Sequence, residues 1–123
     1  MAIVEHLLAP HSIAAPLHVH TREDEFGFVL EGRVSLRLGE EEHVVEPGDL
    51  VVKPRGQWHT FWNATDRPAR VLEMIAPGGL EELFRAMGRG DDVDVPAQIA
   101  AAGCRGDPEA TEPIVSAYGL TWG

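Results

Sequence analysis

Residues 17–25 read LHVHTREDE, and a second stretch, GQWH, ends downstream at His59. In an extended strand, side chains two positions apart share a face, so His18 and His20 point the same way. The polar residues after His20 form a turn, and Glu25 then opens an apolar run on a neighbouring strand. Three imidazoles and one carboxylate suit a borderline divalent metal. We therefore expect a metal site that only folding assembles, from three strands.

The spacing around these residues is more specific than a lone His-x-His pair, which often occurs by chance. Six residues separate Glu25 from Gly32, and the second block has fixed positions at Gly48, Pro54, Gly56, His59 and Asn63. This pattern resembles the two signature motifs of the cupin superfamily, HxH(x)4E(x)6G and G(x)5PxG(x)2H(x)3N. The resemblance covers about Ser12 to Ala76. Its one departure is Ser12 itself, where the first motif often begins with glycine.

The resemblance implies a fold and a ligand set. The fold is all-β, a double-stranded β-helix or jelly-roll barrel, with a short helical C-terminal segment. We divide the chain into a barrel over residues 1–79 and a helical extension over residues 80–123 that packs on the barrel within one domain. A chain of 123 residues with 44% hydrophobic content is long enough to bury one such core. The implied metal ligands are His18, His20, Glu25 and His59.

The strand that begins at Glu25 has two contrasting faces. Glu25, Gly27 and Val29 share one face, and Phe26, Phe28 and Leu30 share the other. If Glu25 points into the barrel, the three large apolar side chains point out of it. Such a patch needs a cover, either a second subunit or the C-terminal segment, and we expect a homodimer.

The metal site predicts a pocket beside it. Gly27 leaves room near the metal because it has no side chain. Val29 continues the same face, and Phe61 lies two residues beyond His59 on its own strand. We expect Gly27, Val29 and Phe61 to line a cavity that receives a small-molecule substrate or ligand.

Beyond residue 79 the apolar period changes from two to nearly four, which favours helices. We predict short helices over residues 80–87 and over about residues 94–103. Asp107-Pro108 is a further helix-start signal, but Pro113 interrupts it, so we expect the last helix to run only from about Glu112 to Tyr118.

Composition excludes some partners. The formal net charge of −10 argues against nucleic acid and anionic membranes, which basic surfaces attract. Cys104 is the only cysteine, so no internal disulfide is possible and we expect a cytoplasmic protein without a targeting leader. We interpret Cys104 as an incidental free thiol, and His6 and His11 as surface residues.

Three histidines and one glutamate leave two positions open in an octahedral site, which a structural zinc site would not do. The ligand set suits Fe, Mn, Ni, Cu, Co or Zn and does not choose among them. Its pattern resembles that of quercetin-type dioxygenases, so our first hypothesis is a metal-dependent dioxygenase or other oxygenase acting on a small organic molecule. A non-catalytic binding or sensing module is the alternative. An isomerase, epimerase or lyase ranks last, because Glu23 and Asp24 are the only bases that the sequence offers near the site.

Overall fold

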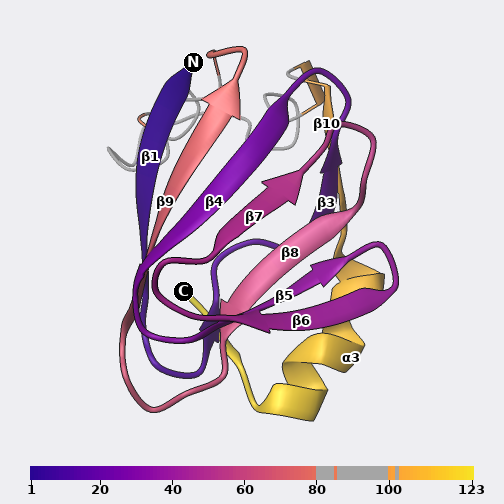
Figure 1. Ribbon diagram of the computed structural model, residues 1–123. Helices are drawn as coiled ribbons and strands as arrows, with labels where there is room; N and C mark the ends of the chain where they lie inside the picture. Colours follow the sequence, from indigo (N-terminus) through magenta and orange to yellow (C-terminus); the bar gives the residue numbers. More distant parts are fainter. Residues whose placement is uncertain (80–84, 86–99, 102) are drawn as a thin grey trace.

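A computed structural model describes residues 1–79, 85, 100–101 and 103–123. One of its two sheets has four antiparallel strands in the order β1-β9-β4-β7 (Figure 1). The β1 strand lies at an edge, and β4 lies between its partners β9 and β7. The strands are β1 (Ala2–Leu8), β4 (Asp24–Glu31), β7 (Leu50–Lys53) and β9 (Ala69–Ala76).

The second sheet has seven strands and faces the first (Figure 1). Its main path runs β10-β3-β8-β2-β11, and β5 joins β8 while carrying β6 on its other side. Together the two sheets form the double-stranded β-helix that the sequence predicts. The strands are β2 (Ser12–Ile13), β3 (Leu17–His20), β5 (Val34–Leu38), β6 (Glu41–Val45), β8 (His59–Asn63), β10 (Cys104–Asp107) and β11 (Thr121–Trp122).

The sheets enclose an apolar core that arises from the period-two patterning of the strands. Inward side chains of both sheets meet there, and burying them stabilises the fold by about 25 cal/mol per Å² of apolar surface. The buried members of this cluster are Leu8, Val29, Val34, Ala69 and Val71, with Phe61 packed against them.

Two motif glycines hold the turns that bring the sheets together. Gly32 has φ +80°, and a Cβ there would lie 2.7 Å from the Pro68 carbonyl oxygen, so no other residue fits without a shift. Gly56 has φ +81°, and its N–H donates to the His20 carbonyl oxygen at 2.8 Å. The second motif is thereby tied to the strand that carries two predicted ligands.

The last helix is longer than the sequence predicts. Helix α3 spans Pro108–Tyr118 rather than starting near Glu112. Asp107 caps it by accepting from the Ala110 N–H at 3.0 Å, and Pro108 occupies the first turn, where its missing N–H costs nothing. Pro113 removes one backbone donor within the helix, and this loss does not end it because the cap and the buried Ile114 hold the helix on both sides. The helices expected over residues 80–87 and 94–103 fall largely outside the described residues.

The C-terminal segment also supplies strands. Strand β10 pairs with β3, and β11 pairs in parallel with β2, so strands from beyond residue 79 are built into a barrel sheet. Helix α3 packs on the outer face of the seven-stranded sheet, where Ile13, Trp62, Ile114 and Leu120 form a buried cluster. Within the described residues, no helix has the length and apolarity needed to cross a membrane.

Candidate metal centre

Folding brings the four predicted ligands together from β3, β4 and β8. His18 is the register partner of His59 across β3 and β8, and Glu25 faces them from the opposite sheet. Each of the four side chains offers one ligand atom, and these atoms all lie within 4.8 Å of one another. Their role as ligands stays a prediction, which this close approach supports. The cluster comprises His18, His20, Glu25 and His59.

Backbone carbonyls fix the tautomers of two imidazoles. His18 Nδ1 donates to the Pro16 carbonyl oxygen at 2.7 Å, and His59 Nδ1 donates to the Gln57 carbonyl oxygen at 3.1 Å. A carbonyl oxygen only accepts, so Nδ1 carries the proton in both rings. The Nε2 atom of each ring is thereby left for the centre of the cluster.

Burial lowers the pKa of His18 to about 3, and the neighbouring imidazoles of His59 and His20 act in the same direction. A divalent metal needs neutral imidazole, since the lone pair on nitrogen forms the bond. At neutral pH, His18 is therefore ready to bind without losing a proton.

His20 and Glu25 form the charged part of the cluster. The Glu25 Oε1 atom lies 2.6 Å from His20 Nε2 and 3.1 Å from His59 Nε2. Burial alone would lower the pKa of His20, but the neighbouring Cys104 thiol and the Glu25 carboxylate outweigh it and raise the pKa to about 10. Burial alone would raise the pKa of Glu25, but its contacts with His20, His59 and Glu73 hold that pKa well below its usual range. The cluster therefore favours a positive charge, either a proton on His20 or a cation, beside the ionised Glu25 carboxylate.

These donors fit a divalent transition metal. The set contains three imidazoles with Nε2 directed to one point and one ionised carboxylate, and it includes no soft thiolate. Three of the four residues are buried, so water competes little for the site. His20 turns Nε2 toward Glu25 at 2.6 Å, and its Nδ1 is buried without a hydrogen-bond partner. The chemistry of the residues does not select one metal.

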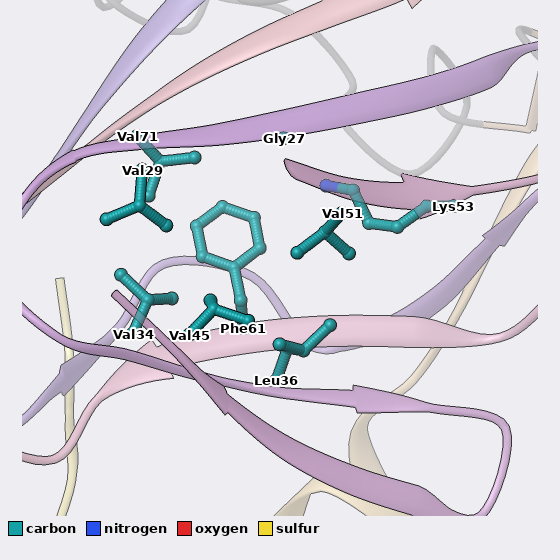
Figure 2. A pocket seen from close by; sticks show the side chains of 9 residues that line it. All are labelled: Gly27, Val29, Val34, Leu36, Val45, Val51, Lys53, Phe61 and Val71. Atoms are coloured by element: carbon teal, nitrogen blue, oxygen red, sulfur yellow. The ribbon is translucent and has the colours of Figure 1, made fainter. Parts of the chain in front are cut away.

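A narrow cavity with about 20 Å³ of interior space lies along the strands β4 and β8, which also carry Glu25 and His59. Gly27 and Val29 follow Glu25 along β4, and Phe61 follows His59 along β8, and all three line the cavity. Figure 2 shows the Phe61 ring pointing into it toward Val29 and Val71. Every lining residue is apolar or glycine except Lys53, whose side chain reaches in beside Gly27 (Figure 2).

Sequence reasoning missed the charged group inside this cavity. Lys53 forms a buried ion pair with Glu73, and its ammonium lies 4.9 Å from the centroid of the Phe61 ring. His6 Nε2 lies 2.6 Å from the other Glu73 oxygen, so His6 is no surface residue. One signal was available: Glu73 is an acidic residue in the middle of the largely apolar strand β9. Lys53 is the direct register partner of Glu25, a pairing that no local pattern reveals.

The structure also separates the two acids of the turn before Glu25. Asp24 forms an exposed ion pair with Arg55 and lies away from the cluster. Glu23 is 7% exposed, and its Oε1 atom lies 3.8 Å from His20 Nδ1. Cys104 is a free thiol, as the sequence predicts, but it is buried and is the register partner of His20 across β10 and β3.

Known proteins resemble this chain over the same region. The tetracenomycin polyketide synthase protein TcmJ of Streptomyces glaucescens is 33% identical over 60 residues, which make up 49% of this chain and 40% of that relative. The chain thus matches well under two thirds of that relative's length. A crystal structure of a sugar phosphate isomerase from a cupin superfamily, from Silicibacter pomeroyi, is 33% identical with a TM-score of 0.58, covering 62% of this chain and 50% of the other.

A second solved structure, TT1209 from Thermus thermophilus, is 36% identical with a TM-score of 0.56 and covers 59% of this chain and 69% of its own. A model of the cupin domain matches residues 4–75, from β1 into β9. That span includes all four clustered side chains and more than half of the chain. The chain therefore belongs to the cupin superfamily.

Proposed function

We propose that this cupin is a metal-dependent enzyme that acts on a small, largely apolar organic molecule carrying oxygen donors. One observation carries the proposal: β4 and β8, which supply Glu25 and His59 of the cluster, also supply Gly27, Val29 and Phe61 of the apolar cavity lining. Such a cavity excludes water and accepts an apolar body, while the metal end requires oxygen donors.

Different residues of the chain would bind the metal and the substrate. The three imidazoles and Glu25 would hold the metal, and Phe61, Val29 and Val71 would hold the apolar body of the substrate. A bound divalent metal would supply a Lewis acid and, if it is redox-active, one-electron chemistry. Gly27 leaves space between the predicted metal ligands and the apolar lining. The side chains nearest to a Cβ at this position would be Val71 and Lys53, at 3.7 Å and 3.9 Å.

The first candidate reaction is a dioxygenase or other oxygenase reaction on an aromatic or enol-like molecule. The cavity supports it, because its lining carries no polar side chain other than Lys53. An apolar, dry interior suits a substrate of this kind and protects reactive species from water.

The second candidate is a proton-transfer reaction of the isomerase or lyase type, and the buried Lys53–Glu73 pair favours it. This pair places the Lys53 ammonium at the cavity wall and the Glu73 carboxylate beside Glu25. Charged groups held at such a place can deliver or accept a proton beside a carbonyl. The solved relative described as a sugar phosphate isomerase agrees with this reaction class, but the apolar lining does not favour a sugar phosphate as the substrate.

One experiment separates these possibilities. The protein is purified without chelators under nitrogen, and its metal content per chain is measured. Acetylacetone, an enol-forming diketone, is then tested for metal-dependent oxygen uptake. Acetoin, a hydroxyketone, is tested under nitrogen for deuterium exchange from heavy water. Oxygen uptake supports the first candidate and deuterium exchange supports the second. Saturable binding of either probe without turnover favours the binding module, and failure to take up any divalent metal would overturn the proposal.

A further inference from the structure

Two buried polar atoms without hydrogen-bond partners face each other beside the metal centre. In the described part of the chain, three buried side-chain nitrogen or oxygen atoms lack a partner: His20 Nδ1, Glu23 Oε1 and Trp62 Nε1. The first two lie 3.8 Å apart. Buried polar groups are rarely left unpaired, so two of them side by side indicate that they can pair with each other.

The other two imidazoles show what is missing. His18 and His59 each donate Nδ1–H to a backbone carbonyl, of Pro16 and Gln57 respectively, and each turns Nε2 toward the cluster. His20 also turns Nε2 inward, to Glu25, but its Nδ1 has no such carbonyl. A metal on Nε2 requires the proton to be on Nδ1, and ligating histidines almost always donate that proton to a carbonyl, a carboxylate or water.

We propose that Glu23 is the positioning residue for His20: its carboxylate accepts the Nδ1–H of His20 when a divalent metal occupies Nε2. Each imidazole of the centre then has its own acceptor. The inference rests on the metal-binding part of the proposed function. It assigns to Glu23 the orientation of one ligand, not contact with the metal or the substrate.

The Glu23 side chain is buried in a turn that hydrogen bonds hold in place. Its side chain is 9% exposed, so water does not replace the missing partner. The turn is anchored on both sides, because the Thr21 N–H donates to the Gly103 carbonyl at 2.9 Å and the Arg55 N–H donates to Asp24 Oδ1 at 2.8 Å. A rotation of the Glu23 side chain that moves Oε1 by about 1 Å would bring the two atoms to normal hydrogen-bond distance without moving the backbone.

Cys104 is the competing acceptor. It is buried and pairs with His20 across β10 and β3. The thiol lies near enough to interact with the His20 ring, but a thiol is a weak acceptor, whereas a carboxylate forms short, charge-assisted bonds. The geometry therefore favours Glu23, and the test includes both residues.

The test measures Zn²⁺ affinity by competition with a chromophoric chelator. Glu23→Ala should weaken Zn²⁺ binding by about 10–100-fold, the usual effect of losing an acceptor behind a ligating histidine. Glu23→Gln keeps the size of the side chain and a weaker acceptor, so it should lose less Zn²⁺ affinity than Glu23→Ala. Glu23→Asp keeps a carboxylate and should also bind Zn²⁺ more tightly than Glu23→Ala. Asp24→Asn is the matched control on the same turn, and it should bind Zn²⁺ like the wild type, as should Cys104→Ala.

A spectroscopic readout separates positioning from a purely structural role. In the Zn²⁺-loaded, ¹⁵N-histidine-labelled wild type, the His20 Nδ1 proton should exchange slowly with water, and in Glu23→Gln it should exchange faster. Metal-free unfolding midpoints check that the variants fold. If all Glu23 variants bind Zn²⁺ as tightly as the wild type, or if only Cys104→Ala binds it more weakly, the inference is wrong. Either result would leave the metal site itself intact. A wild type that binds no Zn²⁺ or other divalent metal would overturn the proposed function as well.

Discussion

The four-stranded sheet buries three charged side chains within its otherwise apolar inner face and directs large apolar side chains outward. On its inner face, Glu25, Lys53 and Glu73 are 3–4% exposed. On its outer face, Ile3 is 63% exposed and Val52 is 52% exposed. In most half-buried sheets, apolar residues face the core and polar residues face water, so the buried charges and the exposed apolar row both depart from that arrangement.

The difference teaches that the two faces serve different purposes. Buried charges are costly unless they are paired, and every inner charge of this sheet has a partner in the described structure: Lys53 with Glu73, and Glu25 with the imidazoles. The inner face thus holds its charges in pairs, beside the predicted metal ligands. The outer face offers large apolar side chains and gains free energy only if something covers it.

The outer face of the other sheet shows what such a cover does. Helix α3 packs there, and Trp62 beneath it is fully buried. On the outer face of the four-stranded sheet, register places Ile3, Met74, Phe26 and Val52 in one row across all four strands. Among the described residues, large side chains of this face remain exposed, so a second copy of the chain is the cover that we expect.

The largest effect should come from removing an inner-face ligand. His59→Ala should abolish stoichiometric metal, with a loss of more than about 100-fold in affinity, because even contacts behind a ligand are worth 10–100-fold. Elemental analysis of the purified variant measures this loss. His43→Ala is the control, since His43 is an exposed histidine on β6. Unchanged metal content in His59→Ala would disprove the ligand set.

Breaking the buried ion pair comes next. Lys53→Met should destabilise the fold by about 3–5 kcal/mol, because Glu73 would be left as a buried, uncompensated charge. Denaturant unfolding measures the loss. The double variant Lys53→Met/Glu73→Leu should recover much of it, since removing both charges also removes the penalty.

Arg55→Met provides the contrast for this prediction. It breaks the exposed Asp24–Arg55 pair, and we expect little change in unfolding free energy because water screens that pair. If Lys53→Met and Arg55→Met had equal effects, the inner face would not hold its charges in a dry interior.

An outer-face substitution should change assembly instead of metal content. Light scattering of the wild type at micromolar concentration should give about twice the mass of one chain, as the apolar face implies. Val52→Asp places a charge in the exposed apolar row and should give a monomer with full metal content. A monomeric wild type would remove the argument for a dimer, and loss of metal from Val52→Asp would show that the two faces are not independent.

A pH dependence should change metal affinity less per pH unit than the loss of one ligand does. The pKa of His20 is raised to about 10, so at neutral pH its ring holds a proton that a metal must displace. Affinity should therefore rise with pH, by about tenfold per pH unit below that pKa. Chelator competition between about pH 6 and pH 8 measures the slope. His18, with its pKa lowered to about 3, is already neutral and adds nothing to it. A flat profile would contradict this charge assignment.

Much of the fold could be predicted from the sequence, because the signals are local. Period-two alternation placed the start of β4 to within one residue, and the motif spacing identified the superfamily. The start of α3 was misplaced, because a proline inside a helix weighs heavily in a local pattern and tertiary packing can outweigh it.

The sequence alone determined which side chains share a face of one strand: His18 with His20, Glu25 with Gly27, and His59 with Phe61. Only the tertiary structure decided which residues meet across strands: Lys53 opposite Glu25, Cys104 opposite His20, and Glu23 buried against the same ring. The physical reason is that side-chain direction along a strand has a fixed period of two, whereas strand register and sheet packing depend on contacts between residues far apart in the chain.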